Sequence, residues 1–195
     1  MPTMTVVRLK TYPSGVLGSV VDFTEALVQG AFTEDNILAG LNNKYGNKTS
    51  TAFFGEDIWV KNFGQWFTRE ISVPDQDIRD LDLNDETASK NIYEELDNGA
   101  DFQLLIGHLI GMDHAGHTYD TLHPELPRKM HDIELIVEKI IEKMDDDTTL
   151  MLFGDHGQTI AGSHGGSSEE EMRTVFFAYQ KKPFPMSQKY QEHRE

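Results

Sequence analysis

Hydrophobic and polar positions alternate along the chain in blocks that predict a series of strands and helices. In residues 34–46, Ile37, Leu38, Leu41 and Tyr45 recur at helical spacing and the pattern stops at Gly46, so we expect a helix there. Residues 84–99 begin with capping and acidic residues and then place apolar side chains on one face, which predicts a second helix. The strongly amphipathic segment 126–144 predicts a third helix.

Short apolar runs between these helices predict strands. Residues 51–55 and 69–73 are β-rich, and the latter run ends before Pro74. Residues 101–112 and 148–157 contain continuous apolar runs, which are typical of strands buried on both faces. A helical turn at 167–172 and a last strand at 174–179 follow. Strands that alternate with helices predict an α/β fold, with a mostly parallel central sheet flanked by helices.

Composition narrows the classes of function. The 195 residues fit one domain, and a formal net charge of −16 argues against nucleic acid or an anionic membrane surface as a partner. The chain has no cysteine, so a metal would be held by His, Asp, Glu or hydroxyl oxygen. We find neither a signal-peptide pattern nor a run of about 18 apolar residues of the kind that spans a bilayer.

Asp and His residues follow the two apolar runs, at 113–117 and at 155–156. Ligands gather beyond the carboxyl ends of parallel strands, so the two groups can converge on one site. Asp113 and His117 are four residues apart, and one helical turn or compact loop can point both at one ion. His164 lies among small residues in "GSHGG", where an imidazole can approach a metal without steric competition.

Together with Asp155 and His156, these residues provide five nitrogen or oxygen ligands, which suit zinc, manganese or another divalent ion. Five side chains exceed the needs of one tetrahedral zinc, so two ions are expected. The alternative is that each Asp-His group caps a helix or supports a turn, and the joint occurrence of both groups with a third histidine argues against it. His114 is a weaker candidate for substrate contact, with a structural role equally open.

No chemistry is assigned to the other histidines. His108 is expected to pack inside its strand. His123, His131 and His193 are expected at a helix entry, on a helix surface and in the tail.

The stretches "MDHAGH", "FGDHGQT" and "GSHGGSS" resemble the alkaline-phosphatase superfamily, and more closely its branch of glycosylphosphatidylinositol (GPI) ethanolamine phosphate transferases. The lead-in "PTMTVVRLKTYPSG" resembles the nucleophile region of that branch, and "EDNI", "FFGEDIWVKNF" and "HPEL" resemble further stretches in the same order. Residues 2–180 are covered. "HPE" and "FFAY" are similar to the type 3 subfamily, and "GSHGGSS" is also close to type 2.

The resemblance implies an alkaline-phosphatase-like catalytic domain with Thr3 as the nucleophile. It implies one metal site of Asp113, His117 and His164, and a second of Asp155 and His156 completed by Thr3. Thr3 would take phosphoethanolamine from phosphatidylethanolamine and pass it to a mannose of the GPI precursor. Two divalent ions, zinc in preference to manganese, would be the cofactors.

The resemblance also implies a cellular location, and the sequence departs from the family pattern at one point. The location is the lumenal face of the endoplasmic reticulum membrane, with attachment through regions that this sequence does not contain and with an accessory membrane subunit as a further partner. The family carries one more metal-ligating Asp on a strand upstream of the nucleophile, so we expect a truncated single domain over 1–195 that lacks its first strand, with a flexible tail at about 181–195. A phosphodiesterase or phosphatase that uses water, and a non-catalytic metal-binding fragment, remain alternatives.

Overall fold

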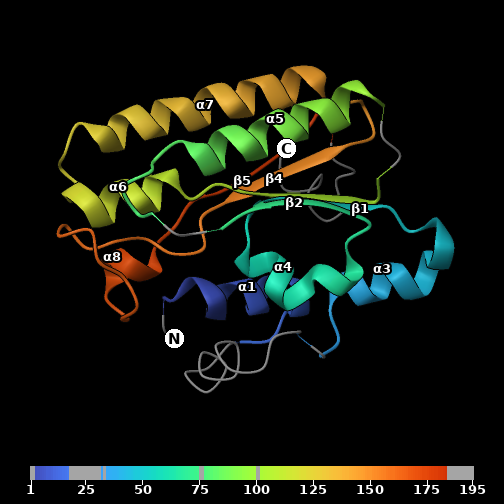
Figure 1. Ribbon diagram of the computed structural model, residues 1–195, viewed down its shortest axis with the longest axis horizontal. Coiled ribbons are helices and arrows are strands. Elements are labelled where there is room, and N and C mark those ends of the chain that lie inside the picture. The colour runs from blue at the N-terminus through green and yellow to red at the C-terminus, as the bar shows by residue number, and fades with distance from the viewer. Residues whose placement is uncertain (1–2, 18–31, 33, 75–76, 100–101, 184–195) are drawn as a thin grey trace, which may run out of the picture.

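The computed structural model describes residues 3–17, 32, 34–74, 77–99 and 102–183. Figure 1 shows a layered α/β arrangement in which α5 and α7 cover one face of the strands and α1, α3 and α4 cover the other. The elements are α1 (Thr5–Ser14), α3 (Ile37–Tyr45), η1 (Gly46–Lys48), β1 (Thr51–Glu56), α4 (Ile58–Phe63), η2 (Gly64–Trp66), β2 (Arg69–Val73), α5 (Leu83–Asp97), β3 (Leu104–His108), α6 (Gly111–Tyr119), α7 (Glu125–Lys143), β4 (Thr149–Phe153), α8 (Glu169–Met172) and β5 (Phe176–Gln180). The predicted fold class is confirmed.

Three parallel strands in the order β2-β1-β3 form the main sheet. All six residues of the central strand β1 are buried. Phe53 lies in an apolar cluster with residues of α1, α3 and α4, whereas Ala52 and Phe54 lie in another cluster with Ala88 and Ile92 of α5. Alternation along one strand therefore supplies a core on each face of the sheet.

The helices begin and end at residues that the sequence marks. The side chain of Asn36 accepts a hydrogen bond from the Ala39 N–H and caps α3, and Gly46 follows its last turn at φ 55°. Ser168 and Glu171 form a reciprocal capping box around α8. These signals explain why the predicted helices are present.

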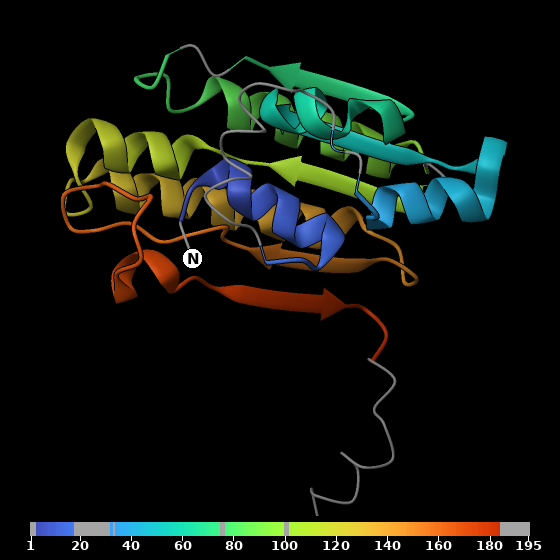
Figure 2. The ribbon, with the colours of Figure 1, turned by 90° about the horizontal axis from the view of Figure 1, so that it is seen from below.

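The prediction of strands buried on both faces holds only in part for β3, where Leu104 and Ile106 pack against one cluster and Leu105 packs against the other, and it is wrong for β4. In β3 the backbone position Gly107 is exposed and the other residues are half-buried. In β4 exposed and half-buried residues alternate, and Met151 is 60% exposed. The reason is that β4 pairs with β5 in a separate antiparallel sheet of two strands, which leaves part of its surface uncovered by the described residues (Figure 2).

The chain after β5 is described as far as residue 183. Lys181, at the start of the predicted tail, donates to the carbonyl of Glu142 at 3.0 Å. Residues 184–195, which make up most of that tail, lie outside the described residues. In the described part of the chain, none of the helices has both the length and the apolar character needed to cross a bilayer.

Candidate metal centre

Asp113 and His117 lie on α6, which starts three residues after β3 ends, and His164 lies in the loop before α8. The sequence allowed a helical turn or a compact loop at 113–117, and the structure has a helix. Residues four apart share one face of a helix, so Asp113 and His117 point to the same side of α6. The folded chain then brings His164 against that face.

The ligand atoms of these three side chains lie within 4.8 Å of one another. Asp113 Oδ2 is 3.4 Å from His117 Nε2, and Asp113 Oδ1 is 3.4 Å from His164 Nε2. One carboxylate and two imidazoles are the donor set that zinc and similar divalent ions accept, and convergence at this spacing fits such an ion. Among the described residues, this is the one group of three such side chains that could hold a metal.

Hydrogen bonds around the cluster orient its ligands. His164 Nδ1 lies 2.7 Å from the carbonyl oxygen of Thr3, which assigns the Nδ1 proton and leaves Nε2 facing Asp113. Gln158 Nε2 donates to Asp113 Oδ1 at 2.8 Å. The same amide packs against Gly116, where a Cβ atom would collide with it. Sequence reasoning missed Gln158, although it belongs to the quoted "GDHGQT" stretch.

Asp155 and His156, which follow β4, adjoin the cluster. The His156 ring stacks on His164 with centroids 3.8 Å apart, and His156 Nε2 lies 3.2 Å from Asp155 Oδ2. His156 Nδ1 lies 3.1 Å from the Gly157 carbonyl, and a proton on this nitrogen would leave the Nε2 lone pair for a metal ion. Burial lowers the pKa of His156, and the nearby His164 adds to this effect. A neutral imidazole is the form that ligates metals.

Two threonines approach the site differently. Thr3, the nucleophile implied by family resemblance, is fully buried; its Oγ1 donates to the carbonyl of Gly166 at 3.0 Å and accepts from Gly165 N–H at 2.8 Å. Thr5, the first residue of α1, places Oγ1 3.2 Å from His156 Nε2. The hydroxyl beside the candidate ligands is therefore that of Thr5, which sequence reasoning did not select.

The remaining histidines lie outside the cluster. His114 is 5% exposed, and its Nδ1 is 2.8 Å from the Asp80 carbonyl. It lines a cleft of about 220 Å³ with Glu56 and Asn84, and this cleft shares no lining residue with the metal cluster. His108 is mostly buried beside Glu56, His123 lies at the start of α7, and His131 is exposed on α7, as expected. His193 lies outside the described residues.

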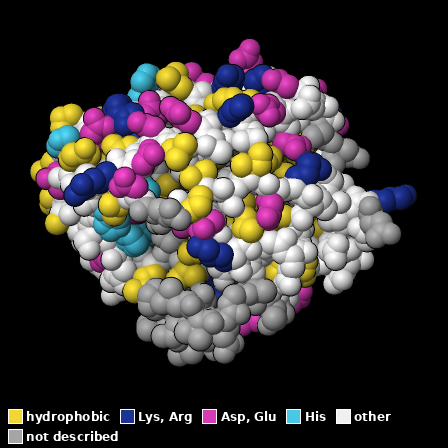
Figure 3. Space-filling model, viewed as in Figure 1, with side chains coloured by type: hydrophobic (Ala, Val, Ile, Leu, Met, Phe, Trp, Pro, Cys, Tyr) yellow, Lys and Arg dark blue, Asp and Glu magenta, His cyan; other side chains and the backbone are white. Residues whose placement is uncertain are grey.

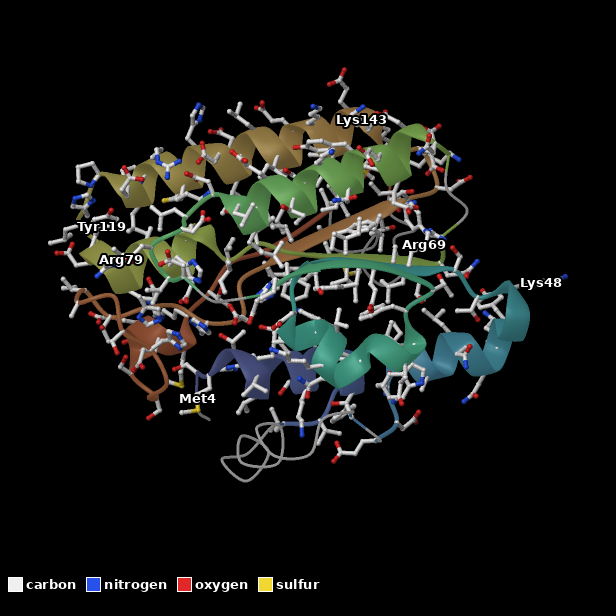
Figure 4. All side chains as sticks on the ribbon, viewed as in Figure 1. Met4, Lys48, Arg69, Arg79, Tyr119 and Lys143 are labelled. Carbon is white, nitrogen blue, oxygen red and sulfur yellow. The ribbon has the colours of Figure 1, made fainter. Side chains whose placement is uncertain are left out.

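The cluster is accessible from solvent. Figure 3 shows histidine side chains gathered on the surface between α6 and α8. In Figure 4, Met4 marks the start of α1 beside α8, and the Met4 side chain approaches Gly165 in the loop that carries His164. The start of α1, α6 and the loops after β4 therefore meet at one edge of the molecule, where the three ligand side chains are partly exposed.

Comparisons with known proteins identify a matching family and several relatives. A family model described as type I phosphodiesterase / nucleotide pyrophosphatase matches residues 17–165. The human GPI ethanolamine phosphate transferase 3, catalytic subunit, is 34% identical over 178 residues, which are 91% of this chain and 16% of that protein. The Saccharomyces cerevisiae GPI ethanolamine phosphate transferase 3 is 32% identical over 183 residues, 93% of this chain and 18% of that protein.

A type 2 relative is also similar. The Yarrowia lipolytica GPI ethanolamine phosphate transferase 2 is 30% identical over 174 residues, 87% of this chain and 20% of that protein. The chain thus spans 16–20% of the length of these three relatives.

Proposed function

The chain belongs to the type I phosphodiesterase / nucleotide pyrophosphatase family, and on this basis we propose that it forms the metal-binding, nucleophile-bearing part of a phosphoethanolamine transferase. The donor would be phosphatidylethanolamine and the acceptor a mannose hydroxyl of the GPI precursor. The names of the relatives support this substrate pair. The proposed location is the lumenal face of the endoplasmic reticulum membrane, with an accessory membrane subunit as a further partner.

The observation that carries the proposal is the position of the Thr5 hydroxyl. Its Oγ1 lies 3.2 Å from His156 Nε2, and the ring of His156 stacks on His164 of the three-residue cluster. Thr3 Oγ1 is instead engaged by the backbone of Gly165 and Gly166. We therefore assign the nucleophile to Thr5 in place of Thr3, and we assign to Thr3 the positioning of the loop that carries His164.

The donor set supports two adjacent metal positions. Asp113, His117 and His164 would hold one ion, and Asp155, His156 and the Thr5 hydroxyl would hold the other. Zinc is preferred over manganese because three of the six protein ligands are imidazoles. Bound dications would lower the pKa of the threonine hydroxyl and stabilise negative charge on the phosphoryl oxygens.

The proposed reaction has two steps. Thr5 Oγ1 loses its proton and forms a bond to the donor phosphorus while the bond from phosphorus to the glycerol oxygen breaks, so that diacylglycerol leaves with a proton. A mannose hydroxyl then attacks the phosphorus of the phosphoethanolamine group on Thr5, the bond from phosphorus to Oγ1 breaks, and the proton of the acceptor returns to Thr5. Thr5 at the first turn of α1 also places the phosphoryl group near the free N–H groups of a helix start, which favour anions.

Hydrolysis is the second candidate, because the family description names phosphodiesterases. In that case water replaces the mannose hydroxyl in the second step while the first step is unchanged. Supplying a mannosyl acceptor separates the two functions. Transfer yields a phosphoethanolamine-modified sugar, and hydrolysis yields free phosphoethanolamine.

The test is to incubate the chain with zinc and phosphatidylethanolamine in detergent micelles, quench with acid, and measure the intact mass and the modified peptide. We expect the mass of one added phosphoethanolamine group on Thr5, its loss in Thr5→Val, and its retention in Thr3→Val. An adduct on Thr3 would return the assignment to that residue. Zinc binding without any adduct or diacylglycerol release would support the non-catalytic reading.

A further inference from the structure

The first turn of α6 is capped by a residue of another helix. The N–H groups of Ile110 and Gly111 both donate to Oδ1 of Asp85 on α5, at 2.9 and 3.1 Å. Ile110, at the N-cap position of α6, supplies no capping side chain of its own. A carboxylate at this end of a helix satisfies donors that the helix cannot use and interacts favourably with the helix dipole.

Asp85 is itself held by a buried ion pair. Its Oδ2 lies 2.8 Å from Nζ of Lys129 on α7, and the two residues are 2% and 1% exposed. Asp82 contacts the same ammonium at 3.1 Å. Burial opposes the charge on Lys129, but hydrogen bonds and attraction from the two carboxylates outweigh it and raise the pKa of Lys129. Asp85 is thereby fixed between three helices.

Gly111 allows this close contact. A Cβ atom at this position would collide with the Leu81 carbonyl, the Asp85 carboxylate and the Lys129 side chain. The backbone at the start of α6 therefore lies directly against the ion pair. A shift of the helix along its axis would break both backbone hydrogen bonds to Asp85.

The helix that is held in this way carries two of the three clustered ligands. Asp113 follows Gly111 by two residues, and His117 lies one turn farther along. The third ligand, His164, comes from a loop that contacts Thr3. The distance between the ligands of α6 and His164 therefore depends on where α6 begins.

We propose that Asp85 is a positioning residue for the metal centre, because it fixes the start of α6 against α5 and α7. The ion pair with Lys129, at 2.8 Å, holds the Asp85 carboxylate in place. This inference rests on the metal site of the proposed function and is independent of its phosphoryl chemistry. Outer residues that orient ligands typically contribute about 10–100-fold to metal affinity.

A purely structural role is the competing explanation. Buried ion pairs often contribute little net stability, and their replacement by apolar residues can be neutral. The test therefore needs a readout that changes with ligand geometry and not with stability. The visible absorption spectrum of bound Co²⁺ provides it, together with Zn²⁺ affinity measured by competition with a chelator under conditions where every variant is folded.

Four variants of the chain separate the explanations. Asp85→Ala removes the cap, and Asp85→Asn keeps an oxygen acceptor for the two N–H groups. The double variant Asp85→Leu with Lys129→Met removes the ion pair without leaving a buried charge. Leu38→Ala, in the apolar cluster on the other side of the sheet, is the control for lost stability.

We expect about tenfold or greater loss of Zn²⁺ affinity and an altered Co²⁺ spectrum in Asp85→Ala and in the double variant. Asp85→Asn should restore the wild-type spectrum, and Leu38→Ala should keep it. Wild-type affinity and spectrum in both Asp85→Ala and the double variant would overturn the inference. If the wild-type chain itself bound neither ion, the metal site of the proposed function would fail first.

Discussion

Thr3 and Thr5 provide a direct comparison, because replacing either residue by valine removes one hydroxyl and keeps the β-branched shape. In Thr3→Val, the Gly165 N–H loses its acceptor and the Gly166 carbonyl loses one of two donors. An unsatisfied buried donor costs about 1–3 kcal/mol and a lost hydrogen bond about 0.5–1.5 kcal/mol. We therefore expect Thr3→Val to lower the free energy of unfolding by about 1.5–4.5 kcal/mol.

Thr5→Val should cost much less. Its hydroxyl makes one partly buried contact, with His156, which corresponds to about 0.5–1.5 kcal/mol. Urea denaturation of the metal-free chain, followed by circular dichroism, measures both values. Equal losses in the two variants, or a larger loss in Thr5→Val, would refute the assignment of a structural role to Thr3 and a chemical role to Thr5.

Two further predictions concern the metal and the pH. Zinc at 100 times its dissociation constant should stabilise the fold by about 2.7 kcal/mol. Calorimetry should show this as an increase in melting temperature. The increase should be lost in His164→Ala and kept in the control His131→Ala, which lies on the exposed surface of α7. Hydrogen bonds from Ser168 and Gly166 lower the pKa of Glu171 to about 2, so its contribution to stability is present above pH 4.5 and is lost as the pH falls toward 2. Acid titration of metal-free Glu171→Gln should show a shallower decrease of stability in that window, and an unchanged slope would contradict the assigned role.

The sequence predicts the five strands and helices α3, α5, α7 and α8, because local signals and core periodicity agree there, but it does not predict α1 or α4. Asn36 and Gly46 bound α3, and apolar alternation through Phe53 marks the central strand. The burial of β4 is predicted wrongly, and that of β3 is overestimated, because a continuous apolar run reports the hydrophobicity of a strand and not the number of its neighbours. The antiparallel pairing of β4 with β5 depends on contacts that no local pattern encodes.

The residues of the candidate site are likewise predicted only in part. Strand ends and glycine-rich loops identify Asp113, His117 and His164, and the structure brings these three together. The choice between Thr3 and Thr5 depends on which hydroxyl lies toward His156. The two residues are only two positions apart in one segment, so the sequence pattern does not distinguish them. The positioning role of Asp85 could not be predicted from the sequence either, because an acidic residue in the first turn of a helix is already explained by capping.

The separation of the two sheets determines which parts of the molecule an ion at the metal centre would connect. Asp113 and His117 follow β3 of the parallel sheet, whereas His164 follows β4 of the antiparallel pair, and the described strands of the two sheets share no ladder of hydrogen bonds. An ion shared by these ligands would act as a cross-link between two sheets that no described strand pairing joins. Ion binding and the ordering of the β4–β5 pair are then thermodynamically coupled. Binding of the ion lowers the entropic cost of ordering the pair, and ordering of the pair lowers the entropic cost of binding the ion.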